Sequence, residues 1–147
     1  SAGTLKLKEN ITFVLRHRIT REVIDKWEIC NDIVTVGKEY VARILSGDSA
    51  DLFRYIAIGT GTTAVTATDT SLETEVKRAL ATNSYEATAK HKLVKEFTFT
   101  SAENHAITEV GVFDAAFTGH MLNRSVFTAR NVDIDTSLEV TVRITIA

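Results

Sequence analysis

The chain has 147 residues, of which 44% are hydrophobic and 24% are charged, with a formal net charge of −2. This composition is that of an ordinary globular domain and excludes a globally disordered chain. No apolar run is long enough for a membrane-spanning helix, and lysine and arginine form no basic stripe of the kind that binds nucleic acid. The single cysteine excludes an intrachain disulfide and a cysteine-rich zinc site.

The first third of the sequence predicts a β-hairpin followed by a helix. Alternation of apolar and polar residues predicts strands over Ile11–His17 and Val23–Ile29, joined by a turn near Arg18–Thr20. The segment Lys38–Leu45 has its apolar residues on one stripe, as an amphipathic helix does. Gly47 stands where a C-cap glycine belongs, so the helix is expected to end just before it.

A second helix is expected after a short central strand. Phe53–Ile58, which ends in the apolar run of residues 56–58, predicts the strand, whereas residues 70–73, with the sequence TSLE, have the form of a capping box. Asp69 or Thr70 would serve as the helix cap. The apolar residues that follow have helical spacing: Leu72, Val76 and Leu80.

The second half of the sequence predicts sheet. Alternation over Leu93–Phe99 predicts one strand, and Ile107–Asp114 and Met121–Thr128 flank a loop with the sequence AAFTGH, as in a hairpin. The clearest strand is the last, because five aliphatic residues face one way and should contribute strongly to the core. These residues are Leu138, Val140, Val142, Ile144 and Ile146.

Together these patterns predict a mainly β (α+β) fold, a single antiparallel β-sandwich or open-barrel domain with two short helices. We expect residues 11–147 to form this β-rich domain. Residues 1–10 are polar and loosely patterned, and we expect them to form a flexible N-terminal arm.

A glycine pattern after the central strand suggests a nucleotide site, but its context is wrong. Gly59, Gly61 and Ala64 nominally fit the dinucleotide fingerprint G-x-G-x-x-G/A. In such a site a helix begins within the glycine turn and faces the pyrophosphate, whereas the first helix cap here is Asp69 or Thr70. We therefore expect no bound cofactor, and expect Gly59 and Gly61 to form a structural surface turn at positive φ.

The sequence announces no catalytic or metal site. Glu109 lies in an apolar strand-like run, where a structural ion pair with Arg124 across a hairpin is favoured over a general base. A small hydrolase that uses Glu109, His105 or Asp114 is the less favoured alternative, so the chain is expected not to be an enzyme. The histidines lie far apart and lack metal-ligand spacing: His17, His91, His105 and His120.

Four blocks of sequence, taken in order, carry a resemblance to a known group of proteins. They are "NDIVTVGKEYVARIL", "YIAIGTGTTAVTATDTSLETEV", "ITEVGVFDA" followed by "GHMLNRSVF", and "SLEVTVRITI". This succession resembles a group of tailed-bacteriophage virion proteins and extends from about Asn31 onward. Each block alone is short, so the resemblance rests on the order of the four blocks.

Two roles are known within that group. One is capsid decoration, in which a cement protein, typically a trimer at local three-fold axes, clamps the outside of an expanded head. The other is attachment, by a domain of tail-collar or tail-fibre proteins, to which residues 59–78 and 107–114 are similar. A tail fibre needs a long shaft after its attachment domain, so we expect decoration for this chain, with a tail, collar or baseplate component as the alternative.

The resemblance implies a structural protein of the virion exterior, made in the cytoplasm of a bacterial host. Its implied partners are the major capsid protein and further copies of itself, in a homotrimer, with no nucleic acid and no membrane. Glu73 and Glu75 become candidates for contacts with a partner subunit. Residues 1–10 become an arm that reaches over a neighbour.

Overall fold

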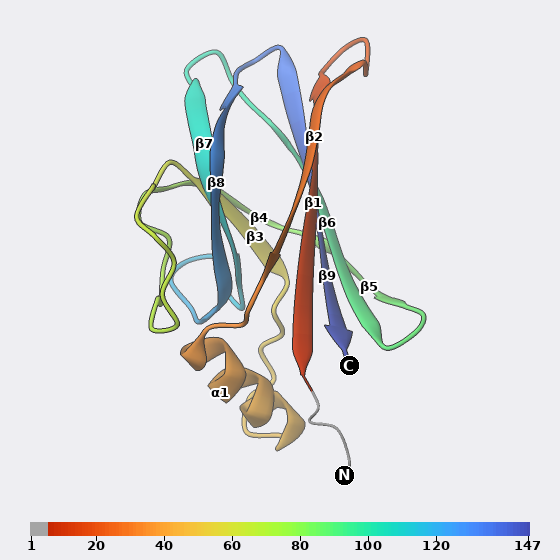
Figure 1. Cartoon of the computed structure of the whole chain (residues 1–147), viewed down its shortest axis with the longest axis vertical. Helices are drawn as coiled ribbons and strands as arrows, with labels where there is room; N and C mark the ends of the chain where they lie inside the picture. Colours follow the sequence, from red (N-terminus) through yellow and green to blue (C-terminus); the bar gives the residue numbers. More distant parts are fainter. Residues whose placement is uncertain (1–5) are drawn as a thin grey trace.

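The computed structural model describes residues 6–147 as two antiparallel β-sheets with a helix at one end (Figure 1). The five-stranded sheet has the order β2-β1-β9-β6-β5 and the four-stranded sheet the order β4-β3-β7-β8. The expected mainly β, α+β architecture is therefore confirmed, in a sandwich-like form. The elements are β1 (Leu7–His17), β2 (Val23–Asn31), α1 (Thr35–Leu45), β3 (Tyr55–Gly59), β4 (Glu75–Leu80), β5 (Thr82–Glu86), β6 (Lys90–Thr98), β7 (His105–Phe113), β8 (Met121–Val132) and β9 (Thr136–Ile146).

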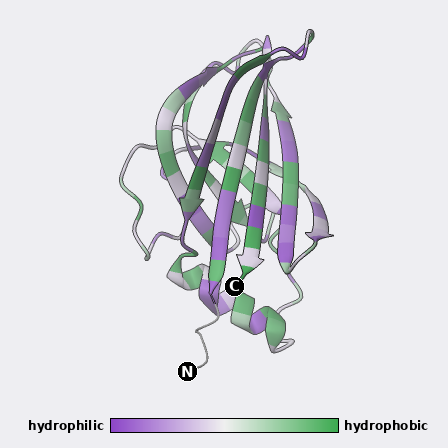
Figure 2. Ribbon diagram, turned by 45° about the vertical axis from the view of Figure 1, so that its right-hand side comes forward, coloured by the Kyte–Doolittle hydropathy of each residue, from purple (hydrophilic) through white to green (hydrophobic). Residues whose placement is uncertain are grey.

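The centre of the five-stranded sheet is β9, which lies between β1 and β6. Its residues Leu138, Val140, Val142 and Ile144 are buried, as the alternation predicts, whereas Ile146, also expected in the core, is 55% exposed at the end of the strand. Val140 lies opposite Phe13 of β1. Apolar and polar bands alternate along these strands in Figure 2. Each buried aliphatic side chain contributes about 1.5–3 kcal/mol, so β9 is a main source of core stability.

The four-stranded sheet is covered on both faces. Ile107 and Val112 of β7 point into the core between the sheets. Phe113 belongs to a second, smaller apolar cluster with Leu72 and Met121 on the opposite face. Because Leu72 comes from the loop between β3 and β4, this loop covers the outer face of the sheet.

Helix α1 covers one end of the sandwich (Figure 1). The expected helix over Lys38–Leu45 is present and begins slightly earlier, at Thr35. Gly37 faces Leu122 so closely that a Cβ atom at residue 37 would lie 2.9 Å from the Leu122 Cα. Gly47 follows the helix with φ +74°, the left-handed conformation expected of a C-cap glycine.

The prediction of a second helix over residues 70–80, with Asp69 or Thr70 as its cap, is wrong. Residues 75–80 form β4, which pairs with β3, and residues 70–74 form bends and irregular chain. The capping box does not form, since the Glu73 carboxylate binds the backbone of Thr62 instead of reaching back to Thr70. Pairing with β3 and contacts within the loop thus override the local helical spacing.

The expected N-terminal arm over residues 1–10 is wrong for its second half. Leu7–Asn10 belong to β1 and pair with β9, with Leu7 opposite Ile146. Residues 1–5 lie outside the described residues, so the expected reach of the arm over a neighbour stays a prediction. Within residues 6–147 no helix is long and apolar enough to cross a membrane.

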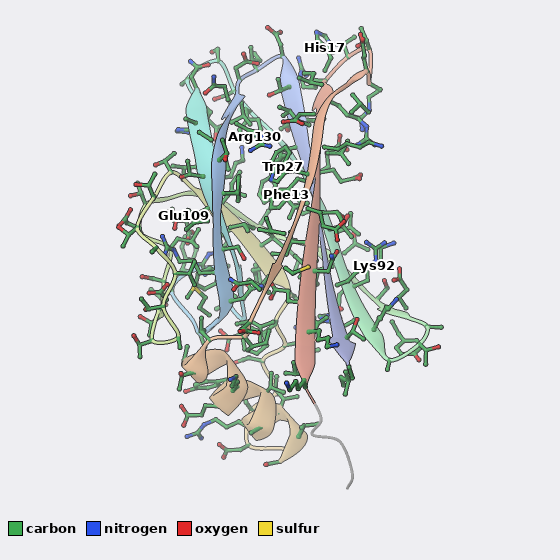
Figure 3. The ribbon with its side chains drawn as sticks, in the orientation of Figure 1. Phe13, His17, Trp27, Lys92, Glu109 and Arg130 are labelled. Carbon is green, nitrogen blue, oxygen red and sulfur yellow. The ribbon has the colours of Figure 1, made fainter. Side chains whose placement is uncertain are left out.

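One edge of the sandwich is closed by aromatic packing between β2 and β8 (Figure 3). The rings of Phe13 and Trp27 stack with centroids 4.7 Å apart, and Phe127 of β8 packs on both. The Arg130 guanidinium lies 4.4 Å from the Trp27 ring centroid, and its Nε donates to Asp25 at 2.8 Å. The two sheets are therefore held together at this edge by side chains instead of backbone hydrogen bonds.

Candidate functional site

The most unusual segment of the fold is the 60–74 loop, which joins β3 to β4 at the side of the four-stranded sheet (Figure 1). Its fifteen residues contain seven threonines and no helix or strand. Loops of this length without secondary structure are uncommon inside a compact domain and are usually either functional or disordered. A rigid scaffold that fixes a long surface loop is a common way to build a binding site.

The loop is anchored by the carboxylate of Glu109, which lies on β7 and is fully buried beneath it (Figure 3). Oε2 accepts the backbone N–H groups of Gly61 and Thr74, each at 2.8 Å. Oε1 accepts the backbone N–H of Glu73 at 2.9 Å and Nε of Arg124 at 2.8 Å. Both ends of the loop and the neighbouring strand β8 therefore meet at one carboxylate.

Arg124 extends the same network from β8 to the middle of the loop. Its Nη1 donates to Asp69 at 3.1 Å and its Nη2 donates to the carbonyl of Thr63 at 3.0 Å. The guanidinium is almost fully buried, and a planar fork of this kind can serve several acceptors at once. The ion pair expected between Glu109 and Arg124 is therefore confirmed, and it has a structural purpose.

Two further carboxylates fold the loop onto itself. Glu73 accepts the backbone N–H groups of Thr62 at 2.8 Å and Thr63 at 3.3 Å, and also binds the Thr63 hydroxyl. Asp69 accepts the backbone N–H of Thr66 at 3.1 Å and its hydroxyl at 2.8 Å. The exposed turns of the loop are thus tied by local side-chain bonds, as in Asx turns.

The two glycines at the start of the loop have a different purpose from the one expected. Neither Gly59 nor Gly61 has positive φ among the described glycines, and both are buried, so they do not form a strained surface turn. A Cβ atom at residue 59 would meet the Thr74 carbonyl oxygen and lie 2.6 Å from Oε2 of Glu109, and one at residue 61 would meet the Glu73 Cβ and lie 2.5 Å from the same oxygen. The positions require glycine because the far end of the loop and the buried carboxylate both approach the backbone there.

The environment of Glu109 suits a permanently ionised anchor and not a proton-transfer group. Burial alone would raise its pKa, but the hydrogen bonds from Arg124 and from three backbone N–H groups outweigh burial and lower the pKa. The four donors also occupy both oxygens. A general base needs a free lone pair and a pKa near the working pH, and Glu109 has neither.

The other residues singled out for chemistry are not brought to this site. Asp114 accepts Nδ1 of His120 at 2.8 Å, beside the β7–β8 turn, while His105 lies at the opposite end of β7 from Asp114. No group of three histidine, cysteine, aspartate or glutamate side chains that could hold a metal occurs in residues 6–147. The combination of Glu109, His105 and Asp114 therefore forms no single catalytic cluster.

Glu73 and Glu75, which were predicted to contact a partner subunit, both bind groups of their own chain. Glu73 is part of the loop network, and Glu75 forms an ion pair with Arg78 at 2.7 Å. Asp69, expected to cap a helix, instead binds Arg124, and Thr70 is exposed in irregular chain. Sequence reasoning missed the three backbone donors to Glu109, since the path of the loop leaves no local signal.

Comparison of the chain with models of known protein families, with curated proteins and with solved structures finds no match.

Proposed function

We propose that this chain is a structural virion protein that decorates the outside of a phage head and stabilises its expanded lattice. The observation that carries the proposal is the Glu109 network. The blocks "YIAIGTGTTAVTATDTSLETEV", "ITEVGVFDA" and "GHMLNRSVF", which carry the resemblance, contribute Gly61, Glu73, Glu109 and Arg124 to one network. The residues behind the resemblance thus build a rigid loop and not a reaction centre.

The 60–74 loop is the surface we propose for the partner, the major capsid protein. Thr62, Thr68 and Thr70 are exposed and offer hydroxyl groups, which both donate and accept hydrogen bonds. Because the loop is already fixed by buried bonds, little conformational entropy is lost when it binds. A preorganised loop with polar groups suits a flat, repeated protein surface.

Stabilisation of the lattice would follow from linkage alone. A protein that binds the expanded lattice and not its open form shifts the equilibrium toward the expanded lattice by mass action. Copies that associate, as in the proposed trimer, share several contacts and gain avidity. Glu73 and Glu75, at the exposed border of the loop, would supply charged contacts at its rim.

The first test is the copy number of this chain in purified virions of the phage that encodes it, relative to the major capsid protein. A number comparable to the capsid subunit supports decoration. A small multiple of the tail symmetry would assign the chain to the tail, collar or baseplate instead, and absence from virions would refute a virion role.

The second test probes the loop directly, by binding purified protein to expanded heads stripped of it. Ala64→Arg changes an exposed residue of the loop that takes no part in the network, and should weaken binding at least tenfold. Ala129→Arg, the same change at an exposed position of β8, serves as the matched control and should bind like the unmodified chain. Equal binding by both variants would argue against the loop as the contact surface.

A further inference from the structure

The five-stranded sheet ends on one side in β2, an edge strand of nine residues (Figure 1). Within residues 6–147, the backbone–backbone hydrogen bonds of β2 go to β1 alone. Its contacts with β8 come from side chains of the inner face, such as Trp27 on Phe127. The outer edge of β2 therefore carries backbone N–H and C=O groups without a backbone partner, which is the arrangement that accepts a further strand.

One N–H group of this edge is capped locally. The Lys26 N–H donates to Oδ1 of Asp25 at 2.8 Å. This bond joins neighbouring residues of the same strand, and a hydrogen bond from an added strand can replace it because the Asp25 carboxylate keeps its second partner, Arg130. The cap thus leaves the edge open to pairing.

The other three edge strands are less suited to pairing. β4 and β5 have only six and five residues, and short edge strands are one way in which proteins avoid pairing. β8 is longer, but two irregularities interrupt its register with β7. The register of β2 with β1 shifts once, between Leu15 and Arg16, and Asp25–Asn31 is regular. The edge best suited to accept a strand is therefore β2.

The charges on the outer face of β2 are complementary to themselves. Lys26 and Glu28 are both exposed, and since they are two residues apart they lie on the same face of the strand. Neither forms an ion pair within residues 6–147, although Glu28 accepts a hydrogen bond from Asn10. A lysine alone at a sheet edge opposes pairing, whereas a lysine and a glutamate in this arrangement can neutralise each other across two antiparallel copies.

Backbone geometry limits how two copies of β2 can pair. The backbone groups of successive residues point to opposite edges of a strand, so two-fold antiparallel pairing must be centred on a residue and not between two residues. Pairing centred on Trp27 places Lys26 opposite Glu28 at two points. Pairing centred one residue away, on Lys26 or on Glu28, places that charge opposite its own copy. The charges therefore select the register centred on Trp27.

We propose that two copies of the chain pair antiparallel through β2, centred on Trp27, so that their five-stranded sheets form one continuous sheet. The contact uses the same surface of both copies and closes as a two-fold dimer. The inference goes beyond the proposed function, because it assigns residues to a contact between copies that does not involve the 60–74 loop. This two-fold contact is independent of the three-fold contact of the proposed trimer, and where both form it joins two trimers.

Charge reversal tests the contact, with sedimentation of the purified chain over a range of concentrations as the measurement. The unmodified chain should associate in pairs. Lys26→Glu or Glu28→Lys places like charges opposite each other at two points, so each should raise the dissociation constant at least about tenfold. Lys38→Glu, at an exposed position of α1, is the matched control and should associate like the unmodified chain. No capsid is present, so failure here would leave the proposed capsid binding untouched.

Combined charge reversals identify the register. The double variant Lys26→Glu/Glu28→Lys again has opposite charges at both points and should pair like the unmodified chain. An equimolar mixture of the two single variants should form one-to-one heterodimers, since one copy then carries two glutamates and the other two lysines. Circular dichroism melting of each variant checks that it is folded. An unmodified chain that does not pair at any concentration, unchanged pairing of the single variants, or a double variant that stays as weak as they are would overturn the proposal.

Discussion

Two buried glutamates, Glu109 on β7 and Glu9 on β1, have opposite surroundings. Glu109 accepts four hydrogen bonds, one of them from a buried arginine. Glu9 is only 3% exposed, points toward the core like its neighbour Ile11, and accepts no hydrogen bond from residues 6–147. Burial is nearly equal, so the difference between them lies in the donors.

The pKa values of the two carboxyl groups follow from this difference. Donors lower the pKa of Glu109 despite its burial. Burial, with a smaller effect of the nearby Asp32 carboxylate, raises the pKa of Glu9 well above its ordinary value. A buried carboxylate therefore stabilises this fold only where the chain supplies hydrogen-bond donors. Glu109 anchors the 60–74 loop, whereas the ionised form of Glu9 destabilises the fold at neutral pH.

The largest effect is expected from Glu109→Gln. The change leaves the Arg124 charge buried without its closest partner and places an amide N–H₂ against N–H donors, which should destabilise the fold by about 3–5 kcal/mol. Urea unfolding at pH 7 measures the loss. Glu139→Gln, on β9 with a surface ion pair to Arg16 at 3.7 Å, is the matched control and should change stability by less than about 1 kcal/mol.

The pH dependence of stability should distinguish the unmodified chain from Glu109→Gln. The folded-state pKa of Glu109 lies below its ordinary value of 4.5, so its contribution is fully present above pH 4.5 and is lost as pH falls through the folded-state pKa. The unmodified chain should therefore lose more stability than Glu109→Gln between pH 5 and about pH 3. Parallel acid titrations of the two would contradict the assignment of Glu109 as the ionised anchor.

A smaller loss is expected from Gly61→Ala. The new methyl group would lie 2.5 Å from Oε2 of Glu109, and overpacking of this kind costs about 1–3 kcal/mol. Thr62→Ala, at the next and exposed position, should stay within about 0.5 kcal/mol of the unmodified chain. The new methyl group would also meet the Glu73 Cβ, so the clash has two sources. The cost of Gly61→Ala should shrink in part in a Glu109→Ala background, and strict additivity would show that Glu109 takes no part in the clash.

Glu9→Gln should have the opposite sign. The raised folded-state pKa means that Glu9 weakens the fold as pH rises above its ordinary value of 4.5, where the unfolded chain ionises freely. Removing the ionisable group should therefore stabilise the fold at pH 7 by about 1 kcal/mol and change little at pH 4. Thermal unfolding at both pH values measures this, with exposed Glu22→Gln as the control. A variant that is less stable at pH 7 would mean that the Glu9 carboxylate has a favourable partner.

The strands that the sequence predicts are those whose burial alternates along a single face. In β9 the residues Leu138, Val140 and Val142 alternate with polar residues, and this alternation indicates which face of the strand is buried in the core. β5 could not be predicted in this way, because four of its five residues are exposed and no apolar pattern distinguishes it from a loop. Its place at the sheet edge is set by pairing with β6.

The false helix shows a different limit of the sequence. Leu72, Val76 and Leu80 have helical spacing, yet Leu72 is buried on the outer face of the four-stranded sheet, Val76 packs on the core between the sheets, and Leu80 is exposed. Three residues in three environments form no common stripe, and spacing alone cannot reveal this. The pair of Glu109 and Arg124 was predictable because a charge buried within an apolar strand is unfavourable unless an opposite charge pairs with it.

The smallest effect, and the most local, is expected from Glu73→Gln, which probes the exposed side of the loop. Hydrogen bonds from the Thr63 hydroxyl and from the backbone of Thr62 and Thr63 lower the pKa of Glu73, so the ionised group holds this turn. The variant should leave the thermal unfolding midpoint nearly unchanged and speed amide hydrogen exchange at Thr62 and Thr63. The Gly61 amide, which donates to Glu109, should stay protected. Loss of protection at all three amides together would mean that the loop opens as one unit and that Glu109 does not hold its base independently.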